Sequence, residues 1–266
     1  MAPGLIDIDW AAPWLAPWRE VGEPLGASVL AGASVADALN QAAQAAGLDC
    51  RFQPQSQAAG AAAYEQGIHE QGLVPTRDNL HDFFNGLGWL HWPQAKQQLN
   101  RLHVNELSQP TRGPAGSRSL RGPVRDALTL LDENGALLQA PDPLWLALQE
   151  RRWLDLFGPL RPLWKQARLF LFGHALLEQL VHPYKSITAH VWRVSGECDG
   201  QVSALDAWLA ADLTPAKLVT KPFAPLPVLG VPGWWAANRS PDFYLDSRVF
   251  RPWRPKIDLR LPAAEA

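Results

Sequence analysis

The sequence predicts an α+β fold that is mostly helical, with a small antiparallel sheet. Apolar residues recur at helical spacing through much of the 266-residue chain, and a few short β-type runs lie between them. The regular alternation of strands and helices that builds a parallel sheet is absent from the pattern. The composition, 47% hydrophobic and 19% charged, is that of an ordinary globular protein. We therefore expect a single domain over residues 1–266.

The N-terminal part of the chain is expected to pack around this domain. Residues 1–33 are rich in proline and tryptophan and are predicted to form an irregular wrap. Ser34 then opens a helix that runs to Ala46, because Ser34 and Asp37 form a variant of the capping box and Gly47 suits the helix end. A short strand over residues 48–53 and a loop over residues 55–63 are expected next.

The stretch from residue 75 to 106 concentrates histidines, asparagines and charges. Thr76 is predicted to cap a first helix, whose apolar face consists of Leu80, Phe83, Phe84 and Leu87. The opposite face carries Asp78, His81, Asp82 and Asn85. This polar face is either solvated, as on any amphipathic surface helix, or it binds substrate through His81, Asp82 and Asn85.

A second helix, from Gln94 to about Leu107, places polar groups on its inward side. Lys96, Asn100 and His103 share the arc of the apolar residues Leu99, Val104 and Leu107. Buried polar side chains need partners, since an unsatisfied neutral group costs about 1–3 kcal/mol and a charge costs more. The three residues therefore either form a structural network or line a cleft.

A segment rich in glycine, proline and arginine follows at residues 111–125. It contains Arg112, Arg118, Arg121 and Arg125 and no acidic residue. Guanidinium groups suit phosphate or carboxylate ligands, although a solvated loop explains the pattern as well. Arg125 and the adjacent Asp126 are candidate substrate-binding residues.

The middle of the chain is predicted to hold a hairpin and a long buried helix. Asn134-Gly135 is a favoured two-residue turn, so residues 126–138 are expected to form a β-hairpin. A helix to about Phe157 follows, and then a long one from Leu163 to Val181. His174 and Glu178 lie four residues apart on its buried face, as a metal-binding, acid–base or structural pair. Residues 186–194 are predicted to add a strand to the sheet.

The C-terminal part begins with a helix from Ser203 to about Leu213. Residues 222–266 are rich in proline and aromatic residues, which excludes long helices and central strands. We expect this segment to be a structural strap over the face where the polar helices meet. Alternatively it is a lid that brings Asn238, Asp242, Tyr244 and Asp246 to a pocket.

Composition limits the range of functions and locations. The formal net charge is −2, with a pI near 6.4, so nucleic-acid binding is not expected. The sequence has no apolar run long enough to span a bilayer and no recognisable secretory signal, so no membrane partner is expected. Its two cysteines lie far apart in the sequence, as is common for unpaired thiols in a reducing compartment, so we expect a cytoplasmic protein. A glycine-rich phosphate loop, a nucleophile elbow and paired CxxC motifs are missing, which disfavours dinucleotide, Walker-type nucleotide and serine-hydrolase chemistry.

Several runs resemble a bacterial family catalogued only as a domain of unknown function. They are, in order, RDNLHDFFNGLGWL, WPQAKQQLN, RDALTLLDENG, FGHALLEQLVHPYKSITAH, PLPVLGVPGWWAAN and PDFYLDSRVFRP. The resemblance covers most of the chain beyond Tyr64. It implies a soluble bacterial protein and carries no activity, cofactor or catalytic residue.

Two hypotheses of function follow from the residues. In the first, the protein is a hydrolase, assisted by a divalent metal and acting on a phosphoryl or acyl ester, with its site between the helices of residues 78–107 and 163–181 and a small anionic ligand as its partner. His103, His174 and Glu178 would then be metal ligands or acid–base groups, Lys96 would neutralise developing charge and Asn100 would orient the substrate. In the second, the protein is a non-catalytic binding or scaffold protein. Convergence of these groups on an open pocket favours the first.

Overall fold

The computed structural model describes residues 2, 4–55, 60–108, 122–195, 198 and 201–253. Six short 3-10 helices connect the main elements within this part of the chain. The helices and strands are, in order, α1 Arg19–Leu30, α2 Val35–Ala45, β1 Arg51–Pro54, α3 Ala61–Gln71, β2 Leu73–Thr76, α4 Leu80–His91, α5 Pro93–Ser108, α6 Pro123–Asn134, β3 Gly135–Gln139, α7 Asp142–Gln149, α8 Trp153–Phe157, β4 Arg168–Leu171, α9 His174–Gln179, β5 Thr188–Arg193, α10 Val202–Asp212, α11 Pro215–Leu218 and β6 Phe223–Pro227.

The fold is α+β, with two small sheets. A four-stranded sheet has the order β4-β3-β5-β6, and β1 and β2 form a separate parallel pair. In the larger sheet, β3 runs antiparallel to β4 but parallel to β5, and β5 runs antiparallel to β6. The sheet is therefore mixed, and the prediction of an antiparallel sheet is only partly right. The prolines of β6 are tolerated because β6 is an edge strand.

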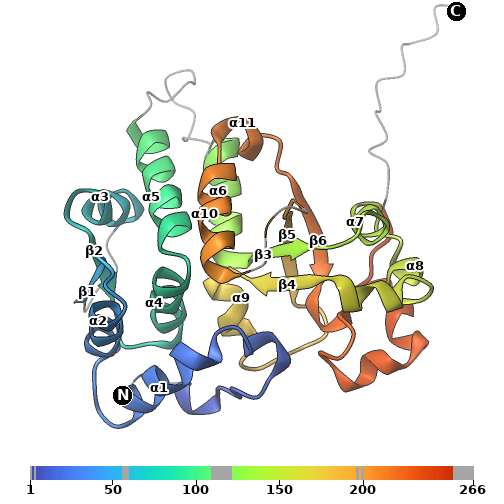
Figure 1. The fold of residues 1–266 in the computed structure, drawn as a ribbon, viewed down its shortest axis with the longest axis horizontal. Helices are drawn as coiled ribbons and strands as arrows, with labels where there is room; N and C mark the ends of the chain where they lie inside the picture. The colour runs from blue at the N-terminus through green and yellow to red at the C-terminus, as the bar shows by residue number, and fades with distance from the viewer. Residues whose placement is uncertain are drawn as a thin grey trace, which may run out of the picture.

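The helices lie mainly to one side of the four-stranded sheet. In Figure 1 the helices α2, α3, α4 and α5 and the β1-β2 pair occupy the left half, and the four-stranded sheet with α7 and α8 occupies the right half. Helices α6 and α9 lie between the halves, where α6 contacts α5 and α9 contacts α4. The helices α4, α6 and α9 thus meet at the centre of the molecule.

A continuous hydrophobic core supports this arrangement. Buried side chains from Ala2 to Phe250 form one cluster, and Trp18, Trp92 and Trp192 are its largest fully buried side chains. Trp14 and Trp234 pack with their ring centroids 6.2 Å apart, so segments near the two ends of the chain meet in the same cluster. In the part of the chain described here, the helices are all too short or too polar to cross a lipid bilayer.

Two of the helix starts show how local sequence fixes the elements. The side chain of Ser34 caps α2 by accepting a hydrogen bond from the backbone of Asp37, as predicted. The prediction for the next helix is wrong, because α4 begins at Leu80 and its cap is Asn79, while Thr76 belongs to β2. Asp78 lies before α4 and accepts a hydrogen bond from the backbone of Val35 at the start of α2.

The predicted hairpin at residues 126–138 is wrong on its first half. Residues 123–134 form helix α6, whose buried residues Val124, Ala127, Leu128 and Leu131 follow the helical period. Gly135 has φ −75°, whereas the two-residue hairpin turn needs positive φ at its central residues. Asn134-Gly135 therefore joins a helix to a strand, and β3 starts at Gly135.

The predicted helix from Leu163 to Val181 is wrong too. It is replaced by a 3-10 helix at Arg161–Gln166, strand β4 and the short helix α9. The run Arg168–Leu171 pairs with β3, and this pairing outweighs the local preference for helix. Gly173 ends the strand segment and is the N-cap of α9. His174 is thereby the first residue of a helix rather than a residue in the middle of one.

The N-terminal wrap is more regular than predicted, because it contains the helix α1. Pro24 lies inside this helix, and Gly22 allows close packing. A Cβ atom at Gly22 would lie 2.3 Å from the ring of Trp10. The tryptophan-rich start of the chain is therefore held against α1.

The C-terminal segment packs away from α4 and α5. Its Tyr244 ring stacks on Phe157 of α8, with centroids 4.6 Å apart, and Arg161 donates a hydrogen bond to the Tyr244 hydroxyl. Asn238 is fully buried and donates to the carbonyls of Leu229 and Val231. These residues stabilise the segment itself and do not line the pocket described below, so the structure gives no support to a lid.

We predict that Gly173→Ala lowers the free energy of unfolding by about 1–3 kcal/mol, the usual cost of overpacking. A Cβ atom there would lie 2.4 Å from the carbonyl oxygen of Glu133 and 2.5 Å from the backbone nitrogen of Asn134. Gly67→Ala is the control, since its Cβ would meet no atom within 4 Å and the change favours helix. Urea unfolding of both variants checks this, and equal stabilities would contradict the close approach of α9 to the end of α6.

Candidate metal centre

A polar cavity of about 260 Å³ lies where α3, α4, α5, α6 and α9 meet. It is open to solvent. Its titratable and amide side chains come from segments far apart in the sequence: Gln55, Tyr64, Glu65, Arg77, His81, Asp82, Asn85, His103, Arg125, Asp132, Glu133 and His174.

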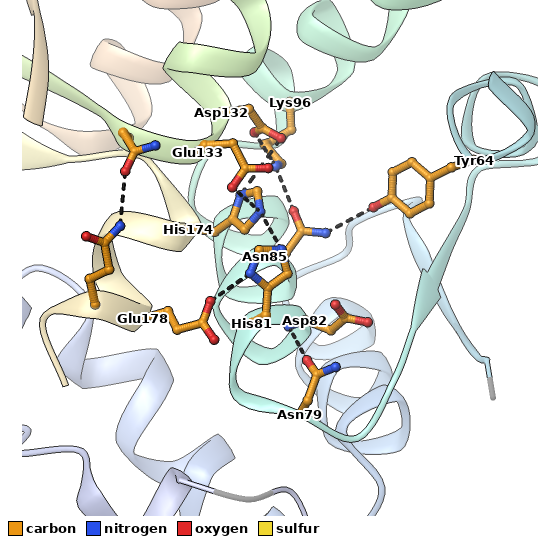
Figure 2. A network of polar contacts seen from close by, with 12 residues as sticks. Tyr64, Asn79, His81, Asp82, Asn85, Lys96, Asp132, Glu133, His174 and Glu178 are labelled. Atoms are coloured by element: carbon orange, nitrogen blue, oxygen red, sulfur yellow. Dashed lines mark hydrogen bonds and ion pairs between the residues drawn. The ribbon is translucent and has the colours of Figure 1, made fainter. Parts of the chain in front are cut away.

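Two histidines face each other in this cavity. His81 lies in the first turn of α4 and His174 begins α9, and the two helices are in contact. Their Nε2 atoms are 3.1 Å apart, and the rings meet edge to face with an interplanar angle of 78°. Figure 2 shows both rings between α4, α6 and α9, with their Nε2 atoms directed toward one another.

Glu133, near the end of α6, completes a set of three ligand atoms. Its Oε2 lies 3.6 Å from Nε2 of His174. The ligand atoms of His81, Glu133 and His174 all lie within 4.8 Å of one another. Two imidazoles and one carboxylate are a donor set found in zinc enzymes and in non-haem iron enzymes.

The opposite nitrogens of both rings face carboxylates. Nδ1 of His81 lies 2.7 Å from Oε2 of Glu178, and Nδ1 of His174 lies 3.8 Å from Oδ2 of Asp132. Glu178 favours a proton on Nδ1 of His81. Asp132 lies beyond hydrogen-bond distance of Nδ1 of His174, which is buried and has no hydrogen-bond partner among the described residues, so Asp132 favours a proton there through its charge alone. With both Nδ1 atoms protonated and both rings neutral, two Nε2 lone pairs point at each other across 3.1 Å. This arrangement is unfavourable unless a cation or a proton lies between them.

A buried polar network holds the floor of the cavity. Lys96 is 5% exposed, and its Nζ donates to Oδ1 of Asp132 at 2.5 Å and to Oδ1 of Asn85 at 2.8 Å. Asn85 in turn donates to the hydroxyl of Tyr64 at 3.0 Å. Burial alone would raise the pKa of Asp132, but the charges of Lys96 and His174 and the hydrogen bond from Lys96 together outweigh it, and the pKa lies below its ordinary value. Asp132 is therefore a carboxylate at neutral pH.

The pKa values of three cavity residues depart from the ordinary in functionally relevant directions. Burial lowers the pKa of His174 to about 4, so that its imidazole is neutral at pH 7. Burial raises the pKa of Glu65 to about 7, and a hydrogen bond from Asn100 offsets only part of this rise. Burial and, next, the charge of Asp132 raise the pKa of Glu133. The cavity thus offers a neutral imidazole and a carboxyl that exchanges a proton near neutrality.

Most of the predicted site residues converge on this cavity. His81, Asp82, Asn85, His103, Arg125 and His174 line it, and Lys96 lies behind it. Asn100 donates hydrogen bonds to the backbone carbonyl and to the carboxylate of Glu65. Asp126 lies elsewhere, in an ion pair of 3.5 Å with Lys221.

The predicted metal set of His103, His174 and Glu178 differs from the group that the structure assembles. His103 lines the cavity but is not part of the ligand group found among the described residues. Glu178 contacts His81 rather than His174, although it lies four residues from His174 on α9. Glu178 therefore contacts the ring nitrogen of His81 that faces away from the ligand group, and it is not itself a member of that group.

The sequence reasoning missed Glu133, Asp132, Glu65 and Tyr64. Asp132 and Glu133 were assigned to the tip of the predicted hairpin, and the helical period of residues 123–134 is the signal that places them on α6 instead. Glu65 and Tyr64 lie on α3, in a stretch with no distinctive polar pattern.

We predict that His174 makes stability depend on pH in the metal-free protein. Its pKa is about 4 in the folded state and 6.5 ordinarily, so below pH 6.5 the unfolded state binds more protons. The stability advantage of wild type over His174→Gln should therefore shrink by about 3 kcal/mol as the pH falls from 7 to 4. Urea unfolding with a chelator present measures it.

Glu65 should act in the opposite direction. Its folded pKa of about 7 lies above its ordinary 4.5, so its contribution is present below pH 4.5 and is lost as the pH rises through 7. The two effects oppose each other in wild type, so the effect of Glu65 must be measured against the variant Glu65→Gln and that of His174 against His174→Gln.

A difference in stability between wild type and His174→Gln that does not change with pH would show that the imidazole of His174 is not held neutral by burial.

Comparison with known proteins identifies a family for this fold and site. The family described as a protein of unknown function (DUF3025) matches residues 50–254, which include every residue of the candidate metal centre. No curated protein and no solved structure matches the chain. Because the match covers well over half of the chain, this protein belongs to the DUF3025 family.

Proposed function

We propose that this protein is a metal-dependent hydrolase whose divalent ion is bound by Nε2 of His81, Nε2 of His174 and the carboxylate of Glu133. The observation that carries the proposal is the pair of Nε2 atoms 3.1 Å apart, with the carboxylate of Glu133 3.6 Å from one of them and Nδ1 of His81 bound to Glu178. A cation between the lone pairs turns an unfavourable contact into a favourable one.

The donor set fits such an ion in distance and in chemistry. Two nitrogen ligands at about 2.0–2.1 Å from a tetrahedral zinc ion are about 3.4 Å apart, close to the 3.1 Å seen here. A metal ligand must be deprotonated at the ligating atom, and the lowered pKa of His174 meets this need. Glu178 has the position of a carboxylate that orients a metal-bound imidazole.

The exposure of the ligands leaves room for a substrate. His174 is buried, whereas the side chains of His81 and Glu133 are 34% and 36% exposed on the cavity side. Three protein ligands with an open position are typical of catalytic rather than structural zinc sites. A structural site would be closed by a fourth protein ligand.

The residues around the set have distinct roles in the proposed hydrolysis. A bound divalent ion polarises a carbonyl or phosphoryl oxygen and lowers the pKa of water. Glu65, whose pKa is about 7, accepts a proton from water and donates it to the leaving group, and Asn100 holds its carboxyl in place. Lys96 is bound to Asp132 and is a positioning residue, since its ammonium group is buried behind the cavity.

A bacterial and cytoplasmic setting accompanies this proposal. Cys50 and Cys198 are both free thiols, which fits a reducing compartment. The net charge of −2 argues against nucleic acid as the substrate, and the narrow cavity suits a small molecule.

We predict that the full chain binds Zn²⁺ at one site and that His81→Ala or Glu133→Gln abolishes this binding. Glu178→Gln should weaken it by about 10–100-fold, the usual effect of losing a carboxylate behind a ligand. His182→Ala is the matched control, because this histidine is 75% exposed and lies outside the ligand group. Isothermal titration calorimetry and metal analysis of untagged protein measure the affinities.

Hydrolysis by the loaded protein tests the activity itself. With p-nitrophenyl acetate and p-nitrophenyl phosphate as probes, a chelator should remove turnover and added Zn²⁺ should restore it. Glu65→Gln should lower turnover while leaving the Zn²⁺ affinity unchanged. If His81→Ala and Glu133→Gln left metal binding intact, or if they only destabilised a protein that binds no metal, the polar groups would be a structural network and the scaffold hypothesis would hold.

A further inference from the structure

We propose that Arg125 is an anion-binding residue of this cavity, so that the substrate is a small molecule carrying a carboxylate or phosphate group. The inference rests on the proposed function in taking this cavity as the substrate site. It adds the class of substrate and the residue that selects it.

Arg125 presents an unused donor at the cavity wall. It lies in the first turn of α6 and lines the cavity. Its Nε atom is buried, and nothing in the described part of the chain accepts a hydrogen bond from it. Residues 109–121, which are not described, contain no carboxylate that could pair with it. A buried charged donor without an acceptor is costly, and an oxyanion in the cavity would supply the acceptor.

The other cationic groups here already have carboxylate partners. Arg77 binds Asp82 through Nε at 2.9 Å and through a terminal nitrogen at 2.8 Å, and Lys96 binds Asp132. The carboxyl of Glu65 is held by Asn100. The charge of Arg125 acts on the carboxyl of Glu65, but its Nε–H has no acceptor among the described residues, so this guanidinium keeps a donor for a substrate.

The charge balance of the cavity couples anion binding to the metal. Arg77, Arg125 and Lys96, which pairs with Asp132 from behind the lining, balance the carboxylates of Asp82, Asp132 and Glu133, and Glu65 adds a partial negative charge, so the cavity is close to neutral without an ion. A divalent ion makes the cavity positive, which then favours an anionic ligand. The guanidinium edge formed by Nε and a terminal nitrogen binds an oxyanion through two parallel hydrogen bonds.

The size of the cavity sets the scale of the substrate. Its volume of about 260 Å³ lies below the range of about 300–1,000 Å³ typical of drug-sized ligands. The anionic group and the scissile bond must therefore belong to one small molecule.

The experiment titrates the full chain, loaded with Zn²⁺, with sodium sulfate and separately with sodium acetate at constant ionic strength. The Nε–H resonance of Arg125 in ¹H–¹⁵N NMR spectra reports the contact directly. We expect that resonance to shift on saturation with one of the two anions. Sulfate identifies a phosphate-type group and acetate identifies a carboxylate.

Variants separate a specific site from general charge effects. Arg125→Gln should weaken binding of the preferred anion at least tenfold, and Arg125→Lys should recover only part of it, because lysine keeps the charge without the fork. Arg19→Gln is the control, since Arg19 lies on α1 in an exposed pair with Glu23. Zn²⁺ affinity should stay unchanged in all three variants.

The outcomes distinguish this inference from the proposed function. Unchanged anion affinity in Arg125→Gln, or an Nε–H resonance that neither anion shifts, overturns the role of Arg125 even if Zn²⁺ binds as expected. Loss of anion binding in Arg125→Gln, with Zn²⁺ affinity intact, supports it. If the chain binds no Zn²⁺, the proposed function fails, and the same titration of metal-free protein decides whether Arg125 binds anions on its own.

Discussion

The ion pair between Lys96 and Asp132 is the interaction on which the centre of this structure depends. It joins α5 to α6 beneath the cavity, and Asn85 extends it to α4. Because Lys96 is almost fully buried, loss of either partner would leave a charge in the interior, at a cost of roughly 3–5 kcal/mol. The same pair keeps Asp132 ionised beside Nδ1 of His174. One contact thus stabilises the packing of three helices and keeps a negative charge close to a candidate ligand.

The three candidate ligands come from helix ends, and this explains how they meet. His81 lies in the first turn of α4, His174 begins α9, and Glu133 precedes the last residue of α6. Helix ends leave their backbone close to neighbouring elements, and Gly173 permits a contact with α6 that a side chain would block. Such an arrangement fixes each ligand by backbone packing rather than by a flexible loop. The carboxylate of Glu178 behind His81 then fixes which nitrogen of that ring faces inward.

Sequence patterns located α4, α5 and the strand β5 well, and the elements between residues 123 and 181 poorly. The buried arc of α5, with Lys96 and Asn100 among its apolar residues, follows directly from the 3.6-residue period. The hairpin prediction failed because Asn134-Gly135, a favoured turn pair, also suits a junction between a helix and a strand. Glu133 was consequently assigned to a turn. The prediction of a long helix from Leu163 failed because β4 forms through its pairing with β3. The grouping of His81 with His174 depends on contacts between residues 93 positions apart, which no local pattern encodes.

The central claim is that the two facing Nε2 atoms of His81 and His174, with the carboxylate of Glu133 beside them, bind a divalent cation. Long-range ¹H–¹⁵N NMR spectra of the histidine rings test it most directly, because they report which nitrogen of each ring carries the proton. With Zn²⁺ added to saturation, the account predicts that His81 and His174 are both protonated at Nδ1 and both show a metal-shifted Nε2. A proton that stays on Nε2 of either ring at saturating Zn²⁺ would contradict it.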